Sequence, residues 1–306
     1  MLRYIVKRVL EVIPTLLLIT FFVFMFVRMI PGDPARLVAG VDATGDTIEV
    51  IREQLGLNKP LFTQYFNYMA GLFQGDLGTS LKTNRAVSYE IGLRYGNTIK
   101  LAAASLIWSC IVGILLGIWS GKNRSKWQDY TGMTIAISGI SMPSFWLGFI
   151  VIMIFSVKLK WFPTTGAGSW KNLVLPAFTL GSSIAAIIAR FTRSSILEVM
   201  KEDYIRTARA KGLKEKIVVW KHAFRNSMIS VITVAGMQFG HLLGGSVVTE
   251  SVFAYPGIGS YLLDSINYRD YPAIQSLILI FSLHFILINL VVDLLYAVLN
   301  PEIQLS

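Results

Sequence analysis

The sequence has few charged residues and little of the chemistry that metal sites and disulfides need. Charged residues make up 15% of its 306 positions and hydrophobic residues 54%, whereas soluble domains average about 25% charged and about 45–50% apolar residues. The one cysteine, Cys110, excludes an intrachain disulfide. The three histidines, His222, His241 and His284, have no zinc-ligand spacing. These absences exclude a disordered chain and a disulfide scaffold, and they argue against a soluble fold.

A phosphate-binding loop is absent as well. That loop has the pattern Gly-x4-Gly-Lys-Ser/Thr. The nearest Gly-Lys pair, Gly121-Lys122, is followed by Asn123 and lacks the upstream glycine. We therefore expect this chain not to hydrolyse ATP, and any ATP-driven activity needs a partner that supplies the energy.

Long uncharged runs are what the sequence does contain. There are six, of 16 to 28 residues, and a helix needs about 17–25 residues to cross a hydrocarbon core about 30 Å thick. The first run reaches this length with its flanks, and the others reach it alone. The sequence therefore predicts an all-α, polytopic membrane protein with six transmembrane helices, at Val12–Val27, Leu101–Gly121, Tyr130–Val157, Asn172–Ala189, Asn226–Thr249 and Tyr271–Val292.

The first run is expected to stay in the protein as an anchor. It exceeds the apolar region of a cleaved signal peptide, about 7–15 residues, and no small-x-small cleavage site follows it. The expected organisation is a transmembrane anchor over 1–30, an extracytoplasmic region over 31–96, and a five-helix membrane core over 97–306. Within that core, a cytoplasmic connection covers 190–225.

Lysine and arginine indicate the orientation. The N-terminus, 122–129 and 190–225 hold 16 basic residues, whereas 158–171 and 250–270 hold 4. Because cytoplasmic loops carry the excess of basic residues, both termini are expected in the cytoplasm. This distribution explains the net charge of +10 without nucleic acid as a partner.

The two long connections contain helices of their own. Outside, Ile48–Leu55 and Pro60–Phe73 have amphipathic patterns. Inside, a short helix is expected over 203–212, because acidic residues at its start suit the positive end of a helix and Gly212 suits the left-handed position after its last turn. Its small residues are expected to form a smooth surface on which another protein can pack: Thr207, Ala208 and Ala210. The alternative is a solvated helix without a binding partner, whose lysines and arginines only set the orientation of the chain in the membrane.

The run Arg206–Leu213, Arg-Thr-Ala-Arg-Ala-Lys-Gly-Leu, resembles the coupling-loop motif of binding-protein-dependent ABC importer permeases, Glu-Ala-Ala, three residues, Gly. Gly212 occupies the glycine and Ala208 the second alanine. The chain as a whole is most similar to the glutathione and dipeptide permeases of the dipeptide/oligopeptide/nickel family. Further marks of that family are Pro31-Gly32-Asp33-Pro34, Leu55-Gly56-Leu57, Gly75-Asp76-Leu77-Gly78, Val252-Phe253 with Pro256-Gly257-Ile258-Gly259, Arg269-Asp270-Tyr271-Pro272, and Asp293 through Asn300-Pro301.

This resemblance implies the type I ABC importer permease architecture, a location in the bacterial inner (plasma) membrane, and a set of partners. These are a second homologous permease subunit, two cytoplasmic ATP-binding subunits that hold ATP and Mg, an extracytoplasmic solute-binding protein, and membrane lipid. The chain itself would have no catalytic residue, cofactor or metal. The implied cargo is a short peptide of the dipeptide or glutathione type, with nickel or an oligopeptide as the alternative. The helix that couples to the ATPases would comprise Asp203, Tyr204, Arg206, Thr207, Ala208, Arg209, Ala210, Lys211 and Gly212.

Polar residues inside the spans are candidates for the translocation path, because such residues usually face protein or water. One group precedes Pro143, which frees a backbone carbonyl near the middle of the membrane. The other group shares a face of the fifth helix. Each group is expected either to line the path or to serve packing and interhelical hydrogen bonds alone. The candidates are Ser138, Ser141, Met142, Gln238 and His241.

Three further groups have candidate roles. Gly236, Gly240 and Gly244 let helices approach closely, within this chain or against the second permease near a gate. Asn289 and Asp293 share a face of the sixth helix and are expected to form a cytoplasmic cap or to contact substrate. The residues expected to contact the binding protein are Tyr255, Pro256, Gly257 and Asp76.

Two other functional classes are weaker alternatives. An ATP-independent carrier or channel should hold buried charges in mid-span, and only Asp293 comes near. An intramembrane hydrolase needs a Ser/His pair, an Asp pair or His-Glu-x2-His, and nothing in the sequence points to one. Copurification with an ATPase would favour the importer.

Overall fold

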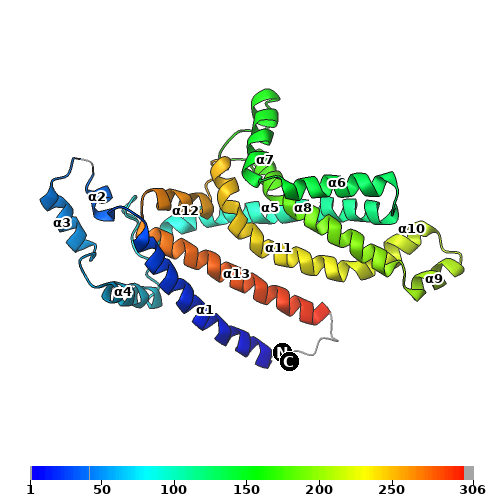
Figure 1. Cartoon of the computed structure of the whole chain (residues 1–306), viewed down its shortest axis with the longest axis horizontal. Coiled ribbons are helices and arrows are strands. Elements are labelled where there is room, and N and C mark those ends of the chain that lie inside the picture. Colours follow the sequence, from blue (N-terminus) through cyan, green and yellow to red (C-terminus); the bar gives the residue numbers. More distant parts are fainter. Residues whose placement is uncertain (1, 41, 300–306) are drawn as a thin grey trace. The chain divides into compact units, whose positions relative to one another are not determined.

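The computed structural model describes residues 2–40 and 42–299, and their regular elements are all helices. Asn300 and Pro301 lie outside the described residues, as does the side chain of Asp293. The α-helices are labelled in Figure 1. The elements in chain order are α1 (Leu2–Met29), α2 (Pro34–Ala39), α3 (Gly45–Gln54), α4 (Leu61–Phe73), α5 (Val87–Lys122), α6 (Trp127–Ser141), α7 (Ser144–Val151), the π-helical segment η1 (Ile152–Lys158), α8 (Lys171–Val199), α9 (Asp203–Ala210), α10 (Glu215–Ile217), the π-helical segment η2 (Val218–Ala223), α11 (Phe224–Val252), α12 (Ile258–Asn267) and α13 (Tyr271–Leu299).

Among the described residues, five helices are long and apolar enough to cross a membrane: α1, α5, α8, α11 and α13. A sixth candidate is α6 with the helical stretch Ser144–Lys158, a pair bent by 104°. If that pair crosses as one unit, the number of spans equals the predicted six. The predicted fold class, an all-α polytopic membrane protein, is confirmed.

The bend in the third span follows from Pro143. The residue before a proline avoids helical dihedral angles, and Met142 has φ −85° and ψ 125°, in the extended region. Helix α6 therefore ends at Ser141, and α7 begins at Ser144. A proline inside a helix kinks or breaks it, and here the helix is broken, with an angle of 104° between its two parts.

The chain divides into two compact units, Met1–Thr98 with Pro256–Ile286, and Ile99–Tyr255 with Leu287–Ser306. Each unit therefore consists of two segments that are far apart in the sequence. Helix α5 also begins at Val87, well before its uncharged run.

The first unit is held together by the start of α13. Val27 of α1 packs with Tyr271 and Ile274 in one buried cluster. Buried Asp270 accepts a hydrogen bond from Ser80 Oγ at 2.5 Å, and Ser276 Oγ donates to the carbonyl of Leu77 at 2.9 Å. The start of α13 thus fixes both α1 and the segment that precedes α5.

The second unit is built around α8, which packs against α6, α7 and α11 and approaches α5 very closely. A Cβ atom at Gly117 of α5 would lie 2.6 Å from the carbonyl oxygen of Ala189 and 2.5 Å from Thr192 Cβ. On α8, a Cβ atom at Gly181 would lie 2.6 Å from Ser109 Oγ. That hydroxyl donates to the carbonyl of Gly181 at 2.7 Å. The α5–α8 contact therefore admits only hydrogen where these glycines lie.

An ion pair joins α6 to α8. Arg193 donates from Nε to Asp129 Oδ1 at 2.5 Å and from Nη2 to Asp129 Oδ2 at 2.7 Å. The backbone N–H of Ser125 donates to the same carboxylate at 3.0 Å, and Asp129 is 4% exposed. Such two-point pairing fixes orientation as well as distance.

The close α5–α8 contact makes a prediction. We expect Gly117→Ala to destabilise the protein by about 1–3 kcal/mol, because the added methyl overlaps the α8 backbone, and to lower its thermal midpoint in detergent. Gly96→Ala is the matched control on the same helix, since nothing lies within 4 Å of a Cβ there. It should leave the midpoint unchanged or raise it, because alanine favours helix. Equal midpoints for both variants would contradict the close contact.

Candidate functional site

The predicted short helix between α8 and α11 is present as α9 (Figure 1). Gly212 has φ +75°, the left-handed conformation that glycine adopts without strain. Its N–H donates to the carbonyl of Arg209 at 2.9 Å, and the N–H of Leu213 donates to that of Ala208 at 3.3 Å. These two bonds form a Schellman motif, which ends a helix and reverses the chain. The predicted helix and its glycine stop are confirmed.

One face of α9 is attached to its own chain. Ile205 is fully buried and Ala208 is 6% exposed, in a cluster with Val218 and Ala223. The sequence places Ala208 on a surface with Thr207 and Ala210, and for Ala208 this placement is wrong. Residues three apart share a helix face, so Ala208 lies beside Ile205 and faces η2.

The other face of α9 is open. Its exposed residues are Asp203, Tyr204, Arg206, Thr207, Arg209 and Ala210, followed by Lys211 and Gly212. Tyr204 accepts a hydrogen bond from Asn226 Nδ2 at 2.6 Å, which ties the start of α9 to α11. Apart from that bond, this face is charged and accessible, and a second protein could bind it.

An ion pair closes the loop after α9. Arg209 donates from Nη2 to Glu215 Oε1 at 2.8 Å and from Nε to Oε2 at 3.2 Å. These hydrogen bonds from Arg209 lower the pKa of the Glu215 carboxyl below its ordinary value. The pair holds the segment after Gly212 against the helix.

The candidate path residues fall into two separate places. Ser138 and Met142 line a cavity of about 260 Å³ at the break in the third span, together with residues of α5 and α8. Ser138 Oγ and Ser141 Oγ each donate to the carbonyl four residues before them. Gln238 and His241 lie on α11, which contributes no residue to that cavity. The structure therefore brings Ser138 and Met142 together but does not join them to the α11 pair.

The glycines of α11 differ in what they face. A Cβ atom at Gly236 would lie 2.9 Å from Val292 of α13, so Gly236 packs within the chain. Gly240 is buried. Gly244 is exposed, with nothing within 4 Å of a Cβ. Only this last glycine leaves room for another subunit.

The four residues expected to contact the binding protein are not equally accessible. Pro256 and Asp76 are exposed, whereas Gly257 is buried. Tyr255 is 3% exposed and packs in the core of the second unit. The surface position predicted for Tyr255 is therefore wrong, because the turn after α11 directs its ring inward. Tyr255 supports the turn, and Pro256 forms its surface.

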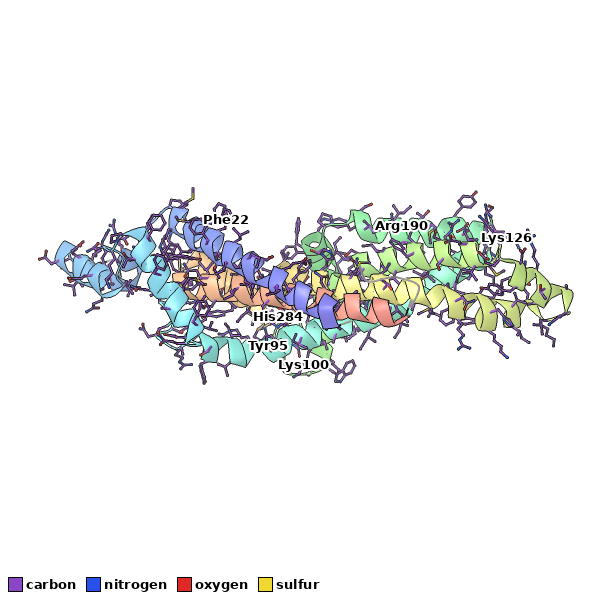
Figure 2. The ribbon with its side chains drawn as sticks, turned by 90° about the horizontal axis from the view of Figure 1, so that it is seen from below. Phe22, Tyr95, Lys100, Lys126, Arg190 and His284 are labelled. Atoms are coloured by element: carbon purple, nitrogen blue, oxygen red, sulfur yellow. The ribbon has the colours of Figure 1, made fainter. Side chains whose placement is uncertain are left out.

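One polar pair inside the membrane helices was not predicted. The Tyr95 hydroxyl of α5 and His284 Nε2 of α13 form a hydrogen bond (Figure 2). His284 Nδ1 donates to the carbonyl of Ile280 at 2.7 Å, because a carbonyl oxygen only accepts, and Nε2 is thereby held facing the tyrosine hydroxyl. The only signal in the sequence is a histidine inside an uncharged run. That signal does not identify the residue with which the histidine forms a hydrogen bond.

Comparisons with known proteins agree along the whole chain. Residues 113–305 match the family described as binding-protein-dependent transport system inner membrane component, and residues 1–102 match its N-terminal counterpart. The chain is 53% identical over 304 residues to the glutathione transport system permease protein GsiC of Escherichia coli (strain K12) and to that of Salmonella typhi, covering 99% of this chain and 99% of each relative.

Solved structures show the same fold at low sequence identity. An inward-facing structure of the MetNI methionine ABC transporter has a TM-score of 0.60 and 18% identity, covering 70% of this chain and 97% of that one. An amino acid ABC transporter with histidines has a TM-score of 0.56 and 13% identity, covering 68% and 94%. These likenesses concern the fold alone.

The Arg209–Glu215 pair predicts a pH dependence. A carboxyl whose pKa is lower in the folded state stabilises that state above its unfolded pKa, and this stability is lost as the pH falls through the folded pKa. We expect hydrogen-exchange protection of residues 203–215 to decrease once the pH drops below about 4.5, the ordinary pKa of a glutamate carboxyl. The loss of protection should be less than about 1 kcal/mol, because both side chains are part-exposed. Glu215→Gln should remove the dependence and exposed Glu198→Gln should keep it. A dependence that survives Glu215→Gln would contradict this assignment.

Proposed function

Because the chain belongs to the family of binding-protein-dependent transport system inner membrane components, and is thus the multi-pass permease subunit of an ABC importer, we propose that its cargo is glutathione. The observation that carries this proposal is the 53% identity, over 99% of both chains, to the glutathione permeases. Other short peptides, such as dipeptides, are the nearest competitors.

Permeases of ABC importers act with an ATPase and a binding protein. We propose in addition that a second homologous permease lies beside this chain in the lipid bilayer, and that two cytoplasmic ATP-binding subunits complete the assembly. Nucleic acid would take no part. ATP and Mg would bind to the ATPases, so this chain would supply no catalytic group. Both termini would lie in the cytoplasm, as the 16 basic residues in the short segments on that side favour.

Helix α9 is the proposed contact for the ATPase. Its exposed face offers Arg206, Thr207 and Ala210, and its buried face is anchored by Ile205 and Ala208 on η2. A movement of the docked subunit would therefore pass to η2 and α11 through packed side chains. The path itself would be completed by the second permease, since Ser138, Ser141 and Met142 are exposed in the single chain.

The test of cargo uses bacteria that lack their own glutathione importer. We expect cells that express this chain with its partner permease, ATPases and binding protein to accumulate radiolabelled glutathione, and to lose uptake when the ATPase is inactivated. Unlabelled dipeptide, oligopeptide and nickel serve as competitors. Uptake of any of these in place of glutathione would overturn the proposed cargo and retain the family assignment.

A negative charge added to the open face tests coupling. We expect Ala210→Glu to leave membrane insertion and thermal stability unchanged but to reduce ATP-driven uptake at least tenfold, because a bulky acid would occupy the docking surface. Gln74→Glu is the control, since it adds the same charge at an exposed external site. Normal uptake by Ala210→Glu would contradict the assignment of α9.

The open glycine of α11 tests the contact with the second permease. We expect Gly244→Leu to leave the isolated chain as stable as wild type but to lower copurification of the partner permease. Gly236→Leu should instead destabilise the chain itself, because its side chain would overlap Val292. Full assembly of the Gly244→Leu variant would mean that α11 does not face the second subunit.

A further inference from the structure

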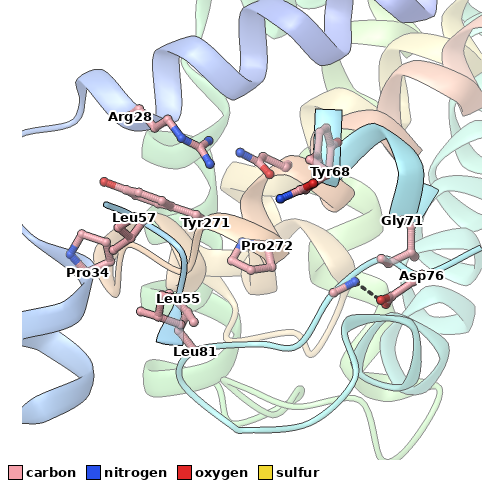
Figure 3. A pocket seen from close by; sticks show the side chains of 14 residues that line it. Arg28, Pro34, Leu55, Leu57, Tyr68, Gly71, Asp76, Leu81, Tyr271 and Pro272 are labelled. Atoms are coloured by element: carbon pink, nitrogen blue, oxygen red, sulfur yellow. Dashed lines mark hydrogen bonds between the residues drawn. The ribbon is translucent and has the colours of Figure 1, made fainter. Parts of the chain in front are cut away.

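The first unit contains a cavity of about 300 Å³ (Figure 3), and Asp76, a candidate contact of the binding protein, is its one lining residue with a functional role assigned above. It lies between the end of α1, helix α4, the turn at 75–78 and the start of α13. Four of the segments that carry the family resemblance contribute to its lining, at Pro34, Leu55 and Leu57, Asp76–Gly78, and Tyr271–Pro272. Segments far apart in the sequence thus meet around one space.

Arg28 places a positive charge at this cavity. Its Nε donates to Gln64 Oε1 at 3.0 Å and its Nη1 to the carbonyl of Phe24 at 3.2 Å. The guanidinium also lies over the Phe24 ring, 3.4 Å from the centroid. No carboxylate of the described residues pairs with Arg28, and its Nη2 has no partner among them. The charge is therefore held in place without being neutralised.

Two more donors at the cavity have no partner. Gln275 is 5% exposed, and its Nε2 forms no hydrogen bond within the described chain. The Tyr68 hydroxyl is likewise buried and unpartnered, and its ring stacks on Phe24 with centroids 6.2 Å apart. Burial raises the pKa of the Tyr68 phenol above its ordinary value, so the hydroxyl keeps the proton that it can donate. Buried donors without an acceptor are costly, and a ligand oxygen would relieve that cost.

The chemistry of these groups defines the ligand. A guanidinium, a phenol and an amide N–H, supplied by three helices, suit one carboxylate. Asp76 lines the same cavity and is exposed, with Oδ1 accepting from the N–H of Gly78 at 2.8 Å. Its charge suits an ammonium group. A small molecule that carries both groups matches the cavity better than a simple anion does.

We propose that this cavity is a ligand site for a small amino acid or peptide zwitterion, whose carboxylate binds Arg28, Tyr68 and Gln275 and whose ammonium group binds Asp76. The site is separate from the candidate path residues, all of which belong to the second unit. The proposal deepens the proposed function by giving this chain its own contact with a peptide-like ligand. Glutathione has both charged groups and is the natural probe.

The test measures binding to the assembled transporter in nanodiscs without the binding protein. We expect glutathione to bind saturably by calorimetry, and Tyr68→Phe and Gln275→Leu each to weaken it about tenfold, the size expected for one hydrogen bond to a charged group. Tyr89→Phe, a change at an exposed tyrosine outside the cavity, should bind as wild type. Asp76→Asn should weaken glutathione but not glutarate, which has carboxylates and no ammonium group.

The two main variants also have a readout in the absence of ligand. Since neither Tyr68 Oη nor Gln275 Nε2 has a partner, removing either should not lower the thermal midpoint, which separates loss of binding from loss of fold. Absence of saturable binding to the wild type, or wild-type affinity in both variants, would overturn the site. Variants that bind glutathione as the wild type does, and lose only the docking of the binding protein, would overturn it as well. Glutarate binding tests the site without reference to the transported cargo. A negative glutathione uptake assay would therefore overturn the proposed cargo without deciding whether this site exists.

Discussion

The close approach of α5 and α8 is the contact on which the second unit depends. Hydrogen is the only side chain that fits at Gly117 and Gly181, where a Cβ atom would lie within 3 Å of the backbone of the facing helix. Lipid gives helices no hydrophobic reason to associate, so close packing and interhelical hydrogen bonds must hold them together. The Ser109–Gly181 hydrogen bond supplies both at one point. With α8 fixed in this way, α6, α7 and α11 can pack on its other sides.

The same helix leads directly into the proposed coupling contact. Helix α8 ends at Val199, and α9 begins four residues later at Asp203. Because Ile205 and Ala208 are buried against η2, α9 is attached to the start of α11 as well as to the end of α8. A protein bound to its exposed face would therefore act on two membrane helices together. Through these contacts, ATP hydrolysis on a bound partner could move α8 and α11 of the permease.

Much of the fold follows from local sequence. The uncharged runs locate the spans, since length and hydropathy are properties of one segment. Gly212 locates the end of α9, because the left-handed conformation is a property of one residue. The start of α5 is missed for a related reason. Lys100 bounds the uncharged run, and Glu90 and Arg94 lie further upstream, yet these two are four residues apart and pair with each other on the helix. A charge pair thus extends a helix where composition alone would end it.

What depends on distant segments could not be predicted. The burial of Ala208 and Tyr255 needs knowledge of which residues lie opposite them, and nothing in either residue's own neighbourhood supplies it. The cavity beside Arg28 is a stronger case, because it exists only where α1, α4 and α13 meet. Sequence could name several of its residues as family marks, but it could not show that they surround one space.

The central claim is that α9 carries the contact between this chain and an ATPase. Cross-linking from a single cysteine tests it most directly, because Cys110 is the only cysteine to replace. In a Cys110→Ser chain assembled with its partners, a cysteine placed by Lys211→Cys should form a short-range adduct with the ATPase. One placed by Ala208→Cys, which faces η2, should not. Adducts from neither position, in an assembly that still hydrolyses ATP, would contradict the account.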